Sequence, residues 1–168
     1  SDVSDVLEVL LLMKEVGIYD LNREKMDPAS SRLDIAPLFE TVDDLERGPS
    51  LLGELFENSA YRPQLEARGR FQEIMLGYSD SGKDGGYTMA SWSLHQAEDA
   101  IGRACLSHKV DFRLFHGRGG TIARGGGRAN RAIMAAPVTS RNGRMRVTEQ
   151  GEVITFRYAL PELAHRHL

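Results

Sequence analysis

The feature that most constrains the fold is an alternation of short apolar segments with segments of helical pattern. Three apolar segments, at 33–39, 71–78 and 110–115, are typical of buried strands. A long segment at 86–106 separates the second strand from the third and has apolar residues at helical spacing. Strands that alternate with helices form parallel βα units, whose functional loops lie at the carboxyl ends of the strands. The sequence therefore predicts an α/β fold with a parallel sheet.

The segments on either side of the first predicted strand are predicted to be helical. Residues 1–17 have the pattern of a largely buried helix that ends at Gly17. Residues 43–68 are predicted to form two or three short helices, because Gly48-Pro49 and Arg62-Pro63 interrupt the helical pattern. Near the other end of the chain, a turn precedes a short strand at 145–147.

The composition limits the partners of the chain. A net charge of −3 and a pI near 6.0 argue against nucleic acid as the main partner. No apolar run approaches the roughly 20 residues that a membrane span requires. Cys105 is the single cysteine, which rules out a disulfide within the chain and fits a reducing compartment. Trp92 and Cys105 are expected to lie in the core.

A loop at 115–128 is rich in glycine and arginine and joins a predicted strand to a predicted helix at 129–136. Glycines allow successive backbone N–H groups to approach an anion beside a helix N-terminus. Arg118 and Arg124 add planar, permanently charged groups that suit phosphate or carboxylate oxygens. This loop is predicted to bind an anion, and a solvated surface loop is the alternative.

Two familiar nucleotide-binding motifs do not fit the chain. The segment 117–122 begins as G-x-G but has Ile122 where the dinucleotide fingerprint has its third glycine. The segment 77–84 matches G-x-x-x-x-G-K, but Asp84 replaces the hydroxyl residue that holds magnesium. Asp80 would also repel phosphates within such a loop.

The segments GYSDSGKDGG at 77–86 and FHGRGGTIARGGG at 115–127 resemble motifs of the phosphoenolpyruvate carboxylase family. Further stretches look like that family's sequence in the same order, so the resemblance covers nearly the whole chain: 1–17, 36–45, 89–101, 146–154 and 159–164. The resemblance implies part of a (β/α)8 TIM-type barrel within a helix-rich protein. A complete barrel takes about 250 residues. Residues 1–168 are therefore expected to be a single segment of the catalytic barrel, truncated at both ends.

The resemblance implies roles for individual residues. Glu40 and Asp80 resemble the two carboxylates that bind Mg²⁺ or Mn²⁺, ions that prefer hard oxygen ligands. Without the resemblance, a carboxylate after a strand is more often a helix cap or a salt-bridge partner. Lys83 resembles the active-site lysine, and Arg124 resembles an arginine that both binds substrate and takes part in catalysis.

The resemblance extends to the start of the arginine-rich loop. Arg118, Gly119 and Gly120 are implied to bind substrate. His116 is implied to be catalytic and to orient or protonate intermediates, although a histidine at a strand end is about as often a satisfied structural group.

The implied activity is a carbon–carbon lyase reaction that serves carbon dioxide fixation. Phosphoenolpyruvate is carboxylated by bicarbonate to oxaloacetate and phosphate, through carboxyphosphate and the enolate of pyruvate, to supply the tricarboxylic acid cycle. The resemblance also implies a homotetramer for the full-length enzyme, and the composition predicts a cytoplasmic protein with no nucleic-acid or membrane partner. The isolated chain is expected to be inactive. The alternative is a noncatalytic anion-binding or assembly module derived from that enzyme.

Overall fold

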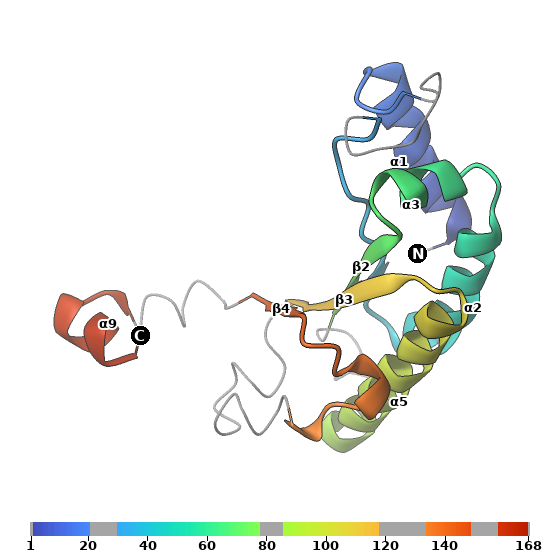
Figure 1. Cartoon of the computed structure of the whole chain (residues 1–168). Coiled ribbons are helices and arrows are strands. Elements are labelled where there is room, and N and C mark those ends of the chain that lie inside the picture. The colour runs from blue at the N-terminus through green and yellow to red at the C-terminus, as the bar shows by residue number, and fades with distance from the viewer. Residues whose placement is uncertain (1, 21–29, 78–85, 118–133, 149–157, 168) are drawn as a thin grey trace.

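The computed structural model describes residues 2–20, 30–77, 86–117, 134–148 and 158–167 (Figure 1). Its centre is a four-stranded sheet in the order β1-β2-β3-β4, and each neighbouring pair of strands is parallel. The strands are Leu38–Phe39, Phe71–Leu76, Asp111–His116 and Met145–Val147. This sheet confirms the predicted α/β class and is what part of a (β/α)8 barrel presents.

Helices connect the strands and pack against the sheet. In the chain, α2 and α3 connect β1 to β2, and α5 connects β2 to β3. In space, α5 packs along α2 (Figure 1). The described helices are α1 (Val3–Glu15), α2 (Val42–Glu57), α3 (Arg62–Ala67), α5 (Gly86–Ser107), the 3-10 helix η2 (Val138–Ser140) and α9 (Pro161–His167). In the described part of the chain, no helix has both the length and the apolarity needed to cross a bilayer.

The two faces of the sheet differ. Along β2 and β3, alternate residues are buried in the core with the apolar sides of α2 and α5: Ile74, Leu76, Phe112 and Leu114. On the opposite face, the side chains of Phe71, Met75 and Phe115 are only half-buried. In a closed barrel this second face is the interior.

The predicted break at Gly48-Pro49 is wrong, because α2 continues through Pro49. A proline inside a helix costs about 3 kcal/mol. The helix also lies close to β1, since a Cβ on Gly48 would be 3.1 Å from the Phe39 ring. Burial of apolar side chains before and after the proline offsets that cost: Leu45, Leu51, Leu52, Leu55 and Phe56. The second predicted boundary is confirmed, as α3 begins at Arg62.

Two predictions of burial are also wrong. Of α1, only Val6, Leu10 and Met13 are buried, so the helix is not largely buried as expected. Trp92 is 57% exposed. The buried face of α5 is set by residues four apart, among them Ala97 and the correctly predicted core residue Cys105, and Trp92 lies outside this repeat. Gly17 does follow the end of α1 with a φ of +75°, as predicted.

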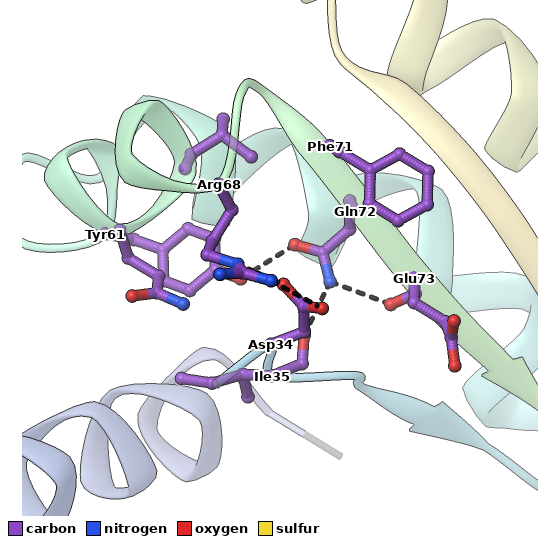
Figure 2. Close-up of a pocket in the computed structure, with 9 residues that line it drawn as sticks. Asp34, Ile35, Tyr61, Arg68, Phe71, Gln72 and Glu73 are labelled. Atoms are coloured by element: carbon purple, nitrogen blue, oxygen red, sulfur yellow. Dashed lines mark hydrogen bonds and ion pairs between the residues drawn. The ribbon is translucent and has the colours of Figure 1, made fainter. Parts of the chain in front are cut away.

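The first predicted strand is shorter than expected. It was predicted at 33–39, but only Leu38–Phe39 pairs with β2. Ahead of this pair, a side chain replaces backbone pairing, because Gln72 Nε2 donates to Ile35 O at 2.7 Å. Gln72 Oε1 in turn accepts from Tyr61 at 2.7 Å. Figure 2 shows these contacts around a small pocket at the amino ends of β1 and β2, the edge of the sheet opposite the predicted site.

Candidate functional site

The four strands end in one row at the carboxyl edge of the sheet. The register pairs their last residues across the sheet: Phe39, Leu76, His116 and Val147. The residues that follow therefore leave the strands at the same edge: Glu40, Gly77, Gly117 and Thr148. Two backbone bonds extend the pairing by one step, from Gly77 N to Phe39 O at 2.8 Å and from Thr148 N to His116 O at 3.1 Å.

This row brings together the starts of three predicted site segments. Glu40 lies beside Gly77, the first residue of the 77–86 motif, and the arginine-rich loop leaves β3 at Gly117. The other predicted site residues lie outside the described residues: Asp80, Lys83, Arg118, Gly119, Gly120 and Arg124. The predicted helix at 129–136 lies largely outside them as well.

Glu40 follows β1 and precedes α2, but its side chain does not cap that helix. Thr41 is the N-cap, and its Oγ1 accepts from Asp44 N at 3.0 Å. The Asp44 carboxylate accepts from the backbone N–H groups of Thr41 at 3.2 Å and Glu40 at 3.3 Å. Among the described residues, none forms a hydrogen bond or an ion pair with the half-buried Glu40 carboxylate. The two alternatives expected for an isolated carboxylate, a cap and a salt bridge, are therefore not met within this part of the chain.

The donor chemistry of Glu40 fits a hard divalent cation. Its carboxylate oxygens are the ligand type that Mg²⁺ and Mn²⁺ prefer, and the neighbouring strand ends are those of parallel βα units. Within residues 2–20, 30–77, 86–117, 134–148 and 158–167, three or more histidine, cysteine, aspartate or glutamate side chains do not gather around one point. Glu40 is thus one suitable ligand, and its predicted partner Asp80 lies outside these ranges.

His116 is buried on the face of the sheet that packs against α5. Its Nδ1 lies 3.9 Å from Oε1 of Glu98, which is also buried. Burial lowers the pKa of His116 to about 4 and raises the pKa of Glu98 to about 7. The imidazole is therefore neutral at pH 7. This environment fits a structural or orienting group, and a catalytic role for His116 stays a prediction.

The sequence analysis did not predict a charged cluster on the face of the sheet opposite to α2 and α5. Glu73 on β2 is 7% exposed, and its carboxylate accepts hydrogen bonds from Arg113 on β3 and from Arg146 on β4. The Arg113 Nε bond measures 2.8 Å and the Arg146 Nη1 bond 2.9 Å. The Arg146 guanidinium also lies 4.6 Å from the centroid of the Phe115 ring.

A signal for this cluster was present in the sequence. Glu73 and Arg113 are each the third residue of their strand, and the register pairs them directly. Opposite charges at matching positions of neighbouring strands indicate a cross-strand pair once the strand starts are known. The cluster joins three strands and leaves one positive charge in excess on the face that a closed barrel would enclose.

Comparison with known proteins places the whole chain among similar sequences. A family model described as phosphoenolpyruvate carboxylase matches residues 1–168. The phosphoenolpyruvate carboxylase of Rhodothermus marinus is 58% identical over 173 residues, which cover 99% of this chain and 18% of the relative. That of Corynebacterium diphtheriae is 49% identical over 168 residues, covering 100% of this chain and 17% of the relative. The chain therefore spans less than a fifth of the length of these relatives.

Proposed function

Because the chain belongs to the phosphoenolpyruvate carboxylase family, we propose that it is a segment of the catalytic barrel of an enzyme that carboxylates phosphoenolpyruvate. Bicarbonate is the second substrate, and oxaloacetate and phosphate are the products. The observation that carries this proposal is the common row of strand ends, from which Glu40, Gly77 and Gly117 all emerge. Parallel βα units bear their functional loops at this edge.

The proposed metal site consists of Glu40 and Asp80 with Mg²⁺ or Mn²⁺. No described residue bonds to the Glu40 carboxylate, which supports the first half of this assignment, and the 77–86 motif supports the second. When bound, the ion would act as a Lewis acid that stabilises negative charge on oxygen. Glu40 and Asp80 would hold the ion at the edge of the sheet and leave its other positions to water and substrate.

The remaining roles are proposed from the two motifs. Lys83 would hold bicarbonate or the phosphate that is transferred, as a compact charge. Arg118 and Arg124 would grip phosphate or carboxylate oxygens through two-pronged hydrogen bonds. Gly119 and Gly120 would allow the backbone to approach the same anion. Such fixed charges stabilise the developing oxyanions without reorganising solvent.

For His116 we propose a positioning role at the start of the arginine-rich loop. His116 directly precedes Gly117 in the sequence. Its imidazole is neutral at pH 7 and faces Glu98 on α5. These features favour a group that orients the start of the arginine-rich loop over one that exchanges a proton with intermediates. The homotetrameric state and the cytoplasmic location remain predictions.

The proposal is tested on the full-length protein that contains this chain. Oxaloacetate formation from phosphoenolpyruvate and bicarbonate is followed with Mg²⁺, coupled to reduction by malate dehydrogenase, in the parent and in Lys83→Ala. We expect bicarbonate-dependent turnover in the parent and a loss on the order of a hundredfold or more in the variant. A protein that binds phosphate but forms no oxaloacetate would instead be the noncatalytic anion-binding module.

A further inference from the structure

Gly77 lies directly against Glu40 where β1 and β2 end. The Gly77 N–H donates to Phe39 O at 2.8 Å, which fixes the Gly77 backbone beside residue 40. A Cβ on Gly77 would lie 2.7 Å from Glu40 Cγ, 3.2 Å from Glu40 Cα and 3.3 Å from Glu40 Cβ. Real Cβ atoms essentially never come as close as the first of these distances. The Glu40 side chain thus occupies the space that any side chain at position 77 would need.

Space, rather than backbone conformation, explains the glycine at this position. The described glycines with a positive φ are Gly17, Gly69 and Gly143, and Gly77 is not among them. A left-handed backbone is therefore not what requires glycine at this position. What an L-residue could not do is share the volume that Glu40 fills.

The ways to relieve the collision change where the Glu40 carboxylate lies relative to the end of β2. Rotation of the Glu40 side chain would remove the contact at Cγ and would redirect the carboxylate. The contacts at Cα and Cβ would remain tight, and separation of β1 from β2 would relieve them by moving Glu40 and Gly77 apart. The Glu40 backbone is held from the other side, because Glu40 N donates to Asp44 at the start of α2.

We propose that Gly77 is a positioning residue for the metal site, because its lack of a side chain sets the direction of the Glu40 carboxylate. This inference rests on the proposed function, in which Glu40 is a metal ligand. Mg²⁺ and similar ions demand near-ideal octahedral geometry, whereas Ca²⁺ tolerates irregular ligand positions. A displaced Glu40 carboxylate would therefore weaken Mn²⁺ or Mg²⁺ binding more than Ca²⁺ binding.

The test measures Mn²⁺ and Ca²⁺ affinity of the full-length protein, with free Mn²⁺ read by electron paramagnetic resonance. Gly77→Ala is compared with Gly102→Ala, in which the new Cβ would lie 2.9 Å from the Thr139 backbone oxygen, between α5 and η2. We expect Gly77→Ala to weaken Mn²⁺ binding about tenfold or more and Ca²⁺ binding less. Gly102→Ala should lower the Tm and keep Mn²⁺ affinity within about twofold of the parent, since its collision is remote from Glu40.

A third variant, Glu40→Gln, separates the metal-ligand role of Glu40 from the positioning role of Gly77. If Glu40→Gln weakens Mn²⁺ binding and Gly77→Ala leaves it within about twofold of the parent, the positioning role is overturned and the metal assignment stands. If Glu40→Gln also binds Mn²⁺ normally, Glu40 is not a ligand and both proposals fail. If Gly77→Ala does not fold, the double variant Gly77→Ala/Glu40→Ala, which lacks the colliding Cγ, must be more stable than Gly77→Ala, and the absence of any gain in stability overturns the positioning role.

Discussion

His116 Nδ1 lies 3.9 Å from Glu98 Oε1, and both side chains are buried where β3 meets α5. Burial disfavours the charged form of each group, so the pKa of His116 falls from 6.5 to about 4 and the pKa of Glu98 rises from 4.5 to about 7. The two shifts affect stability in opposite directions. Stability gained at His116 as pH rises through about 4 to 6.5 is offset by stability lost at Glu98 through about 4.5 to 7.

The first prediction is that Glu98→Gln reveals how the ionisation of Glu98 affects stability as pH changes. At pH 4.5 the variant and the parent should be similarly stable, because the Glu98 carboxyl is then protonated in the folded parent and resembles an amide. As pH rises to 7, the free energy of unfolding of the parent falls, because Glu98 ionises more readily in the unfolded chain than in the folded protein. The Tm of the variant minus that of the parent should therefore increase across this range, by the equivalent of up to about 1.4 kcal/mol per pH unit.

The control for this measurement is Glu46→Gln, which changes an exposed glutamate on α2. Its Tm difference from the parent should stay flat over the same pH range. A flat difference for Glu98→Gln as well would show that the Glu98 carboxyl is ionised in the folded protein at the same pH as in the unfolded chain.

The second prediction concerns the geometry of the proposed oxyanion grip. Arg124→Lys should impair the full-length enzyme nearly as much as Arg124→Ala, on the order of a hundredfold in kcat/KM, because one ammonium cannot form two parallel hydrogen bonds. Arg103→Lys, an exposed change on α5, serves as the matched control and should leave the steady-state kinetics unaltered. Near-normal turnover by Arg124→Lys would count against the two-pronged role.

The third prediction is that the cluster around Glu73 stabilises the sheet. Glu73→Ala removes hydrogen bonds to Arg113 and Arg146 and leaves two like charges on one face, which should cost about 1–3 kcal/mol. Glu66→Ala removes a half-exposed partner of Arg70 and should cost no more than about 1 kcal/mol. Urea unfolding midpoints at one pH compare the two variants, and equal losses would show that the buried cluster is no stronger than a surface pair.

The fourth prediction is that the 168-residue chain alone forms no oxaloacetate. Within the described sheet, β1 and β4 are edge strands, and apolar residues of α1 such as Leu11 and Leu12 are exposed. Such edges and patches favour self-association or local opening, and misplacement of catalytic groups by about 1 Å costs on the order of a hundredfold in rate. The coupled assay compares the fragment with the full-length protein. Turnover by the fragment within about tenfold of the full-length protein would contradict this prediction.

Much of the scaffold could be predicted because local patterns and tertiary packing agree. The alternation in 110–115 corresponds to β3, and the strand predicted at 145–147 is β4. The place of Glu40 at the strand edge also follows from the sequence, since a carboxylate directly after a buried run must leave the sheet there. Pro49 shows where this fails, because burial of the α2 side chains outweighs the local preference to end a helix.

Other features depend on contacts that one segment does not contain. The exposure of Trp92 reflects which face of α5 meets the sheet, and that face is set by β3 and α2 together. The contact of Gly77 with Glu40 joins residues 37 positions apart, and it exists only because β1 and β2 are parallel and in a particular register. The sequence identifies both residues as parts of predicted site segments, but it does not show that Gly77 leaves room for the Glu40 side chain.

Crystals of the full-length protein grown with Mn²⁺ test most directly whether Glu40 and Asp80 form one metal site. An anomalous difference map locates the ion independently of any assumed ligand. We predict one peak at the carboxyl edge of the sheet, about 2 Å from a carboxylate oxygen of Glu40 and from one of Asp80. A peak bound elsewhere, or carboxylates of Glu40 and Asp80 directed to opposite faces of the sheet, would contradict the shared site.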